Sequence, residues 1–317
     1  MIQVLFLHGA EYAYQTRSLI ELINNKSDMC AALCVQWDVD HLEDSIGPDV
    51  DIVVTIHSRK TLVEKVSAYC KENGVITVTL QDGIIDFKHW TVVAPDRYNP
   101  LFTDYIFVFG EASRRLLVER GVDGEKIVVT GCPRFDQYAV AERSERYVLI
   151  TCANTPYHKL AEKVVLFVML LKLILYCRIS SIPFRLRLPP KLKKSFIFRP
   201  LSWLLPGEER SERPLMEDIA DAMCVCTTMS TLVLESLCLR KPVVLINNHN
   251  YPVYINLPHQ MSASMGKIQP RPLSSIRFNE VHEKILLDNA AFLGESTIRV
   301  VETLRQLGKR RVHSRST

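Results

Sequence analysis

The sequence predicts an α/β protein built on parallel sheets, and three observations lead to that expectation. Short apolar runs alternate with longer segments of helical periodicity, which is typical of buried parallel strands covered by helices. The alternation occurs twice along 317 residues, a length that suits two domains with a core each. Hydrophobic residues make up 47% of the chain and charged residues 23%, which excludes disordered, collagen-like and small disulfide-bonded proteins.

The first series of elements covers residues 1–140 and predicts an N-terminal Rossmann-like domain. No GxGxxG follows the first strand, where the loop reads HGAE, so the dinucleotide fingerprint is absent. Asn73-Gly74 and Gly121 mark the ends of two of the helices. We expect strands at 2–7, 31–37, 51–57, 75–80, 105–110 and 126–130, and helices at 15–24, 59–72 and 111–120.

The second series covers residues 141–317 and predicts a C-terminal Rossmann-like domain, joined through a polar link at 137–146. Two such domains are expected to face each other, with a ligand cleft between them, because ligands bind at the carboxyl ends of parallel strands. The span 248–275 shows little periodicity. We expect strands at 147–152, 184–188, 223–227 and 242–246, and helices at 160–177, 214–222, 232–239 and through most of 279–307.

Charge, apolar runs and cysteine content indicate which binding partners and which cellular compartment fit the sequence. Residues 178–206 contain seven Lys and Arg and no acid. Such a run is a solvated loop, a positive wall of the ligand cleft, or a surface for an anionic membrane or polysaccharide. The apolar run 164–177 is too short to span a bilayer and predicts a buried helix, with an interfacial helix as the alternative. Nothing resembles a nucleic-acid module. Nine scattered cysteines, with no secretory signal, favour reduced thiols in a cytoplasmic protein.

Four loops that follow predicted strands carry candidate site residues. Asp82, beside Gly83, is placed to act as a base, although an Asp-Gly turn explains the same dipeptide. Gly131 and Arg134 lie where the domains join, and Arg134 could contact a phosphate or pair with Asp136.

The other two loops belong to the second domain. Thr228, Ser230 and Thr231 precede a helix whose N-terminus suits a phosphate, with an ordinary N-cap as the simpler explanation. Asn154 follows the first strand of that domain and either touches a donor or shapes a turn.

The order of these segments is more specific than any one of them. VTGCPRFD at 129–136, VLIT at 148–151 and PLMEDIADAMCVCTTMSTLVLESLCLRKPVVLIN at 214–247 resemble the GT-B glycosyltransferase superfamily. The resemblance is strongest to bacterial capsule polysaccharide transferases, CDP-glycerol glycerophosphotransferases and CMP-sialyltransferases, and more distant to UDP-N-acetylglucosamine 2-epimerases. It covers roughly residues 75–247.

The resemblance implies roles for particular residues. Ser230, Thr231 and Glu235 stand where the superfamily holds the donor's phosphate and ribose. Asp82 stands where the sialyltransferases carry the catalytic Asp of an acidic-acidic-Gly motif, with Gln81 in place of the first acid.

Two departures from the superfamily concern the second domain. A His-Pro dipeptide that touches the donor's phosphate is replaced here by Pro189-Pro190, which leaves Arg187 or Lys191 as a substitute cation. The epimerases' His-Arg is replaced by Ala153-Asn154, which makes transfer the favoured reaction over epimerisation.

The sequence therefore predicts an inverting, metal-independent transferase that takes a nucleotide-activated sugar, or a glycerophosphate-type donor, and needs no cofactor. The expected acceptor is a glycan or glycolipid of the cell surface, reached in the cytoplasm at the inner face of the membrane, with peripheral contact to anionic lipid. The alternatives are a UDP-sugar 2-epimerase-like enzyme and a catalytically lapsed GT-B protein that binds a glycan or a partner.

Overall fold

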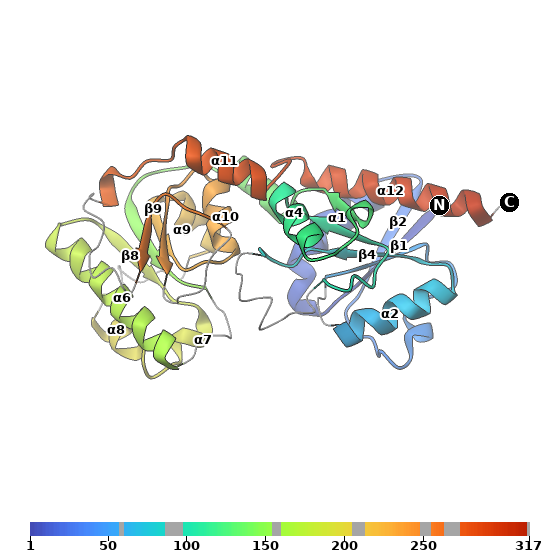
Figure 1. Ribbon diagram of the computed structural model, residues 1–317, viewed down its shortest axis with the longest axis horizontal. Coiled ribbons are helices and arrows are strands. Elements are labelled where there is room, and N and C mark those ends of the chain that lie inside the picture. Colours follow the sequence, from blue (N-terminus) through green and yellow to red (C-terminus); the bar gives the residue numbers. More distant parts are fainter. Residues whose placement is uncertain are drawn as a thin grey trace. The chain divides into compact units, whose positions relative to one another are not determined.

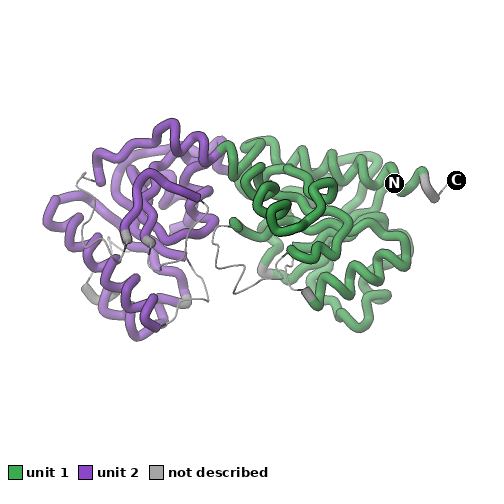
Figure 2. Tube along the Cα trace, in the orientation of Figure 1, with its two compact units in different colours: residues 1–85, 89–137, 287–317 green, residues 86–88, 138–286 purple. Residues whose placement is uncertain are grey.

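The computed structural model describes residues 1–56, 60–85, 98–153, 160–204, 213–247, 255–262 and 273–315. The chain forms two compact units (Figure 2). Unit 1 comprises residues 1–85, 89–137 and 287–317, and unit 2 comprises residues 86–88 and 138–286. Each unit has its own parallel sheet (Figure 1), so the predicted α/β class with two Rossmann-like sheets is confirmed.

Unit 1 contains a six-stranded sheet in the order β2-β1-β3-β4-β5-β6, with every neighbouring pair parallel. Helices α1 and α12 pack over one side of the sheet, around Phe6, Val54 and Leu304, and α2 supplies Val66 and Cys70 to a second core that includes Leu5 and Val53. Its strands are β1 (Ile2–Leu7), β2 (Met29–Cys34), β3 (Ile52–Thr55), β4 (Ile76–Leu80), β5 (Tyr105–Val108) and β6 (Ile127–Val129). Its helices are α1 (Ala13–Asn24), α2 (Lys60–Glu72), α4 (Glu111–Glu119) and α12 (Ser296–Arg315), while α5 (Asp136–Ala139) runs across the boundary into unit 2.

Unit 2 contains a five-stranded sheet in the order β11-β10-β9-β7-β8, also parallel throughout. Its core joins the inner face of α6 to Val148, Ile150 and Cys226 of the sheet. Its strands are β7 (Tyr147–Thr151), β8 (Phe184–Arg187), β9 (Ala222–Thr227), β10 (Val243–Asn247) and β11 (Gln260–Ser262). Its helices are α6 (Leu160–Ile179), α7 (Pro190–Lys193), α8 (Arg199–Leu204), α9 (Leu215–Ala220) and α10 (Thr231–Cys238), while α11 (Glu280–Asn289) runs across the boundary into unit 1.

The structure adds the short helices α5, α7 and α8 to the expected elements, and two further differences change the organisation of the chain. Residues 287–317, assigned from the sequence to the second domain, lie in unit 1, because Val300, Val301 and Leu304 of α12 are fully buried in the same core as β1. The aperiodic span 248–275 contains the short strand β11, which pairs with β10. All nine cysteines are free, and seven of them are buried.

Candidate functional site

The loops after β4 and β5 are joined at the carboxyl end of the unit 1 sheet. Gln81 directly follows β4 and is 1% exposed. Its Oε1 accepts a hydrogen bond from the backbone N–H of Phe109, which follows β5, at 3.0 Å, and its Nε2 donates to the carbonyl of Gly83 at 2.7 Å. The side chain therefore fixes the end of one strand against the end of the next and closes its own loop.

Asp82 lies inside that closed loop and is half-buried. Its backbone N–H donates to the Tyr98 hydroxyl at 3.1 Å. The turn at Asp82-Gly83 is held by the Gln81 side chain and by this bond, so the backbone around the carboxylate is fixed from two directions. A base needs such fixed placement, and the catalytic role of Asp82 stays a prediction.

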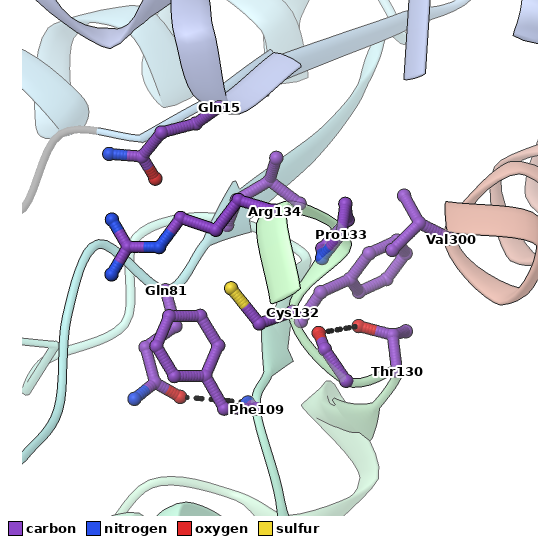
Figure 3. Close-up of a pocket in the computed structure, with 11 residues that line it drawn as sticks. Gln15, Gln81, Phe109, Thr130, Cys132, Pro133, Arg134 and Val300 are labelled. Carbon is purple, nitrogen blue, oxygen red and sulfur yellow. Dashed lines mark hydrogen bonds between the residues drawn. The ribbon is translucent and has the colours of Figure 1, made fainter. Parts of the chain in front are cut away.

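A pocket opens beside these loops, within unit 1 (Figure 3). Its cavity volume is about 20 Å³, which is room for about one water molecule. In the close-up the Arg134 guanidinium lies on the same side as the Gln15 amide, whereas the Gln81 amide points toward Phe109. The Arg134 Nη1 donates to the Tyr14 hydroxyl at 3.2 Å. The lining residues come from α1, from the ends of β4, β5 and β6, and from α12: Gln15, Leu80, Gln81, Phe107, Phe109, Thr130, Gly131, Cys132, Pro133, Arg134 and Val300.

Helix α1 contributes to this pocket through residues that the sequence analysis missed. Gln15 is 8% exposed, and its Nε2 donates at 3.1 Å to Tyr14, the same hydroxyl that Arg134 contacts. A polar residue of an amphipathic helix is normally placed in solvent, so the sequence carries no signal that Gln15 lines a pocket.

Gly131 and Asp136 lie against the start of α12, and each has a structural role there. Gly131 has a φ of +82°, and a Cβ there would lie 2.3 Å from the Ala291 carbonyl oxygen, so only glycine fits. The Asp136 carboxylate accepts hydrogen bonds from the N–H groups of Gly294, Ser296 and Thr297 at 2.7–3.1 Å. This carboxylate caps the N-terminus of α12. Both ends of the GCPRFD segment thus anchor the C-terminal helix, and contact of Gly131 with a donor stays a prediction.

The carboxyl end of the unit 2 sheet shows a similar connection. Thr228 follows β9, and its Oγ1 accepts a hydrogen bond at 2.7 Å from the backbone N–H of Ala153, which follows the neighbouring strand β7. Burial raises the pKa of the nearby Cys152 thiol to about 12, so this cysteine remains a protonated, unreactive side chain. The next residue, Asn154, lies outside the described residues.

Ser230, Thr231 and Glu235 lie at the start of α10. Ser230 is the N-cap, and its Oγ accepts from the Leu232 N–H at 3.3 Å. Thr231 is the first helical residue, and Glu235, 8% exposed, is one turn further on the same side. The simpler N-cap explanation therefore holds for Ser230, while the helix N-terminus still presents N–H groups that suit a phosphate.

Arg187 ends β8, beside Thr151 of β7. Its Nη1 donates to Asp218 Oδ2 at 2.8 Å and to the Arg213 carbonyl. Asp218 is fully buried, and Arg185 approaches its other oxygen to 3.9 Å. The charge of Arg187 is thus largely balanced inside unit 2, and its predicted contact with a donor phosphate would have to be shared with this carboxylate.

The structure thus brings the predicted residues together in two groups. Gly131 and Arg134 line the unit 1 pocket, with Asp82 in the adjoining loop. Thr228, Ser230 and Thr231 lie in the loop that joins β9 to α10 in unit 2.

Comparisons with known proteins support the fold. No protein family model matches the sequence, and no curated protein gives a significant match. Among solved structures, the UDP-GlcNAc 2-epimerase of Neisseria meningitidis bound to UDP-GlcNAc superposes with a TM-score of 0.67 at 14% identity, covering 96% of this chain and 100% of the other. The UDP-GlcNAc 2-epimerase of Methanocaldococcus jannaschii in complex with UDP-GlcNAc and UDP gives 0.65 at 12% identity, covering 96% and 100%.

A third similar structure is a variant of the wall teichoic acid polymerase TagF soaked with CDPG, with a TM-score of 0.62 at 12% identity, covering 98% of this chain and 90% of the other. The resemblance to the GT-B superfamily is therefore confirmed at the level of the fold.

Proposed function

We propose that this chain is an inverting, metal-independent transferase that takes a nucleotide-activated sugar or a glycerophosphate-type donor. Unit 2 holds the donor, and the Asp82 loop of unit 1 serves the acceptor. The fold supports the proposal, because the similar structures are enzymes whose described ligands are UDP-GlcNAc, UDP and CDPG.

The observation that carries the proposal is the loop between β9 and α10. Thr228 ties this loop to the end of β7, and Ser230 and Thr231 begin the helix. The N–H groups of a helix N-terminus attract a phosphate through hydrogen bonds and the helix dipole. In the proposed arrangement they stabilise the charge that develops on the departing phosphate, and Glu235 contacts the donor's ribose.

Asp82 is the proposed base. With a sugar donor, the acceptor hydroxyl oxygen attacks the anomeric carbon, the bond from that carbon to the phosphate oxygen breaks, and the hydroxyl proton passes to the Asp82 carboxylate. With a glycerophosphate-type donor, the same oxygen attacks the glycerol-bearing phosphorus, and the bond to the bridging oxygen breaks so that the nucleoside monophosphate leaves. A positioned base contributes ~10²–10⁴ in rate to such a step. The proposed acceptor is a cell-surface glycan or its lipid carrier at the cytoplasmic face of a membrane.

Two alternative functions remain. A UDP-sugar epimerase is favoured by the superposition on two UDP-GlcNAc 2-epimerases. A lapsed binding protein is favoured by the ion pair of Arg187 with Asp218, which occupies the cation proposed to substitute for the missing His-Pro. Incubation with a UDP-sugar alone separates an epimerase, which converts it, from a transferase, which leaves the sugar unchanged until an acceptor is added.

Replacing Ser230 by Asp tests the donor site directly. Asp is as good an N-cap as Ser, so α10 should stay capped, while the new negative charge repels a phosphate at the same place. We expect the affinity for the best ligand among CMP, CDP and UDP to fall about ten-fold or more, measured by titration calorimetry.

The matched control is Asn279→Asp. Asn279 caps α11, where its Oδ1 accepts from the His282 N–H at 3.2 Å, so the control adds the same charge at another helix N-terminus and should leave affinity unchanged. If Ser230→Asp binds as well as wild type, the donor site lies elsewhere. If wild type binds none of the three nucleotides, the lapsed protein replaces the transferase.

A further inference from the structure

Helix α6 exposes a stripe of apolar side chains. Its five members follow one another at intervals of four or seven residues, which places them along one side of the helix. They are Leu160, Val164, Val168, Leu175 and Ile179, with exposed fractions of 64, 47, 42, 46 and 84%. We call this surface the α6 stripe.

The core of unit 2 does not account for the α6 stripe. Packing against the sheet uses the opposite side of the helix, where Leu166, Leu170 and Leu173 are fully buried. Helix α12, which is equally long, buries Val300 and Leu304 in the same way, but its exposed positions are mainly polar: Arg299, Gln306, Lys309, Arg310 and His313. A helix that is apolar all round is normally covered on every side, and the stripe is the side of α6 that stays exposed.

Cations surround the α6 stripe. From the first stripe residue to the end of α8, residues 160–204, the sequence has nine Lys and Arg and one acid, Glu162. Lys172 is exposed within the stripe and Arg178 at its end. Helices α7 and α8 lie beside α6 (Figure 1), and Phe167 of α6 contacts Phe198 with ring centroids 6.2 Å apart. This neighbouring segment adds further exposed side chains: Lys193, Lys194, Phe196 and Arg199.

Fewer Lys and Arg residues contribute to the exposed basic surface than the sequence predicts. Arg185 and Arg187 belong to the basic run, yet both face the buried Asp218 carboxylate. The exposed cations of the run are Arg178 on α6 and, in the segment that packs beside α6 through Phe198, Lys193, Lys194 and Arg199.

We propose that the α6 stripe and its flanking cations dock on an anionic lipid membrane. An interfacial helix buries its apolar side in the acyl boundary while Lys and Arg contact anionic head groups. A second copy of this chain is a poorer occupant, because it would bring the same cations against these. Within the described residues, no helix combines the length and apolarity needed to cross a bilayer, so α6 would lie along the surface. This inference rests on unit 2 alone and goes beyond the proposed catalytic function.

Vesicle sedimentation tests the proposal without nucleotide or acceptor, so its outcome is separate from that of the proposed function. Wild type should bind vesicles of equal phosphatidylglycerol and phosphatidylcholine at low salt, bind pure phosphatidylcholine far more weakly, and lose anionic binding as salt rises. The triple variant Val164→Asn, Val168→Asn and Leu175→Asn should bind anionic vesicles about ten-fold or more weakly, because each substitution removes apolar surface from the interface.

The matched control replaces Val118, Val281 and Ile298 by Asn. These residues are 48, 48 and 55% exposed on α4, α11 and α12, so the control removes similar apolar surface and should bind as wild type does. Both triple variants should keep the wild-type circular dichroism spectrum, since all six side chains are exposed. Lys193→Gln with Lys194→Gln should weaken binding to anionic vesicles alone.

Three results would overturn the proposal: no binding of wild type to anionic vesicles at low salt, equal loss in both triple variants, or a wild-type dimer in solution that only the α6 variant dissociates. The last result would assign the stripe to a second copy of the chain.

Discussion

At the carboxyl end of each sheet, a buried polar side chain joins two loops by a hydrogen bond; the side chain is an amide in unit 1 and a hydroxyl in unit 2. In unit 1, Gln81 follows β4 and accepts a hydrogen bond from Phe109, at the end of the adjacent strand. In unit 2, Thr228 follows β9 and accepts from Ala153, at the end of the adjacent strand. Each side chain joins two loops, and each is nearly inaccessible to solvent.

The two side chains differ in whether they also position the candidate site residue next to them. Gln81 has a second polar atom, which donates to Gly83 and closes the loop around Asp82. Thr228 offers its hydroxyl to Ala153, and the candidate residues that follow are placed by the start of α10. The comparison shows that a buried polar residue in a candidate site also has a structural role, because its hydrogen bonds hold the loop that carries the neighbouring site residues.

The largest expected effect distinguishes Asp82 from the side chain that holds it. Asp82→Asn keeps the shape and the backbone N–H bond to Tyr98 but removes the proton acceptor. Transfer should fall by about 10² or more, equivalent to ~2.7 kcal/mol of activation free energy, while donor affinity changes little. Steady-state turnover and nucleotide titration measure the two quantities.

The control for this variant is Asp123→Asn. Asp123 caps a short helical turn by accepting from Glu125, and Asn preserves that cap, so turnover should remain normal. An Asp82→Asn protein with near-normal turnover would show that Asp82 is held for another reason and would remove it as the base.

Much of the fold was predictable because parallel strands buried on both faces appear as apolar runs, which the sequence shows clearly for Val53 and Val54 in β3 and Leu149 and Ile150 in β7. The return of α12 to unit 1 was not predictable. Its Val301 and Leu304 pack in one core with β1, at the far end of the chain, and periodicity records which side of a helix is buried but not its partner.

The sequence predicts where the candidate site residues lie in the fold, but not the hydrogen bonds and ion pairs that they form. Loops that follow parallel strands meet at one edge, so Asp82 and Thr228 fall where the sequence expects polar residues. The pairing of Arg187 with Asp218 spans 31 residues, and no local pattern indicates it. Gln81, interpreted from the sequence as the loss of an acid, carries two hydrogen bonds that only a structure reveals.

Gln81→Leu should give the next largest effect, on stability. The variant leaves the buried N–H of Phe109 without its acceptor and the Gly83 carbonyl without its donor. An unsatisfied buried polar group costs about 1–3 kcal/mol, and we expect ~2–4 kcal/mol in total from urea unfolding. The control is Gln306→Leu on the exposed side of α12, which should stay within about 0.5 kcal/mol of wild type. Equal stability of the two variants would contradict the structural role of Gln81.

Thr228→Val should give the smallest effect and completes the comparison. Valine keeps the branched shape and removes the hydroxyl, so the Ala153 N–H, in a residue 6% exposed, loses the acceptor that lies at 2.7 Å. Thr228→Val removes one hydrogen bond, whereas Gln81→Leu removes two. We therefore expect the free energy of unfolding to fall by ~1–2 kcal/mol, about half the loss expected for Gln81→Leu.

The control is Thr303→Val in α12. The Thr303 hydroxyl donates to the Arg299 carbonyl at an exposed position, so water replaces the lost partner and stability should hardly change. Urea unfolding of both variants measures the difference. A Thr228→Val protein as stable as its control would show that the link between β7 and β9 is not maintained by this bond, and the parallel between the two sheets would then fail.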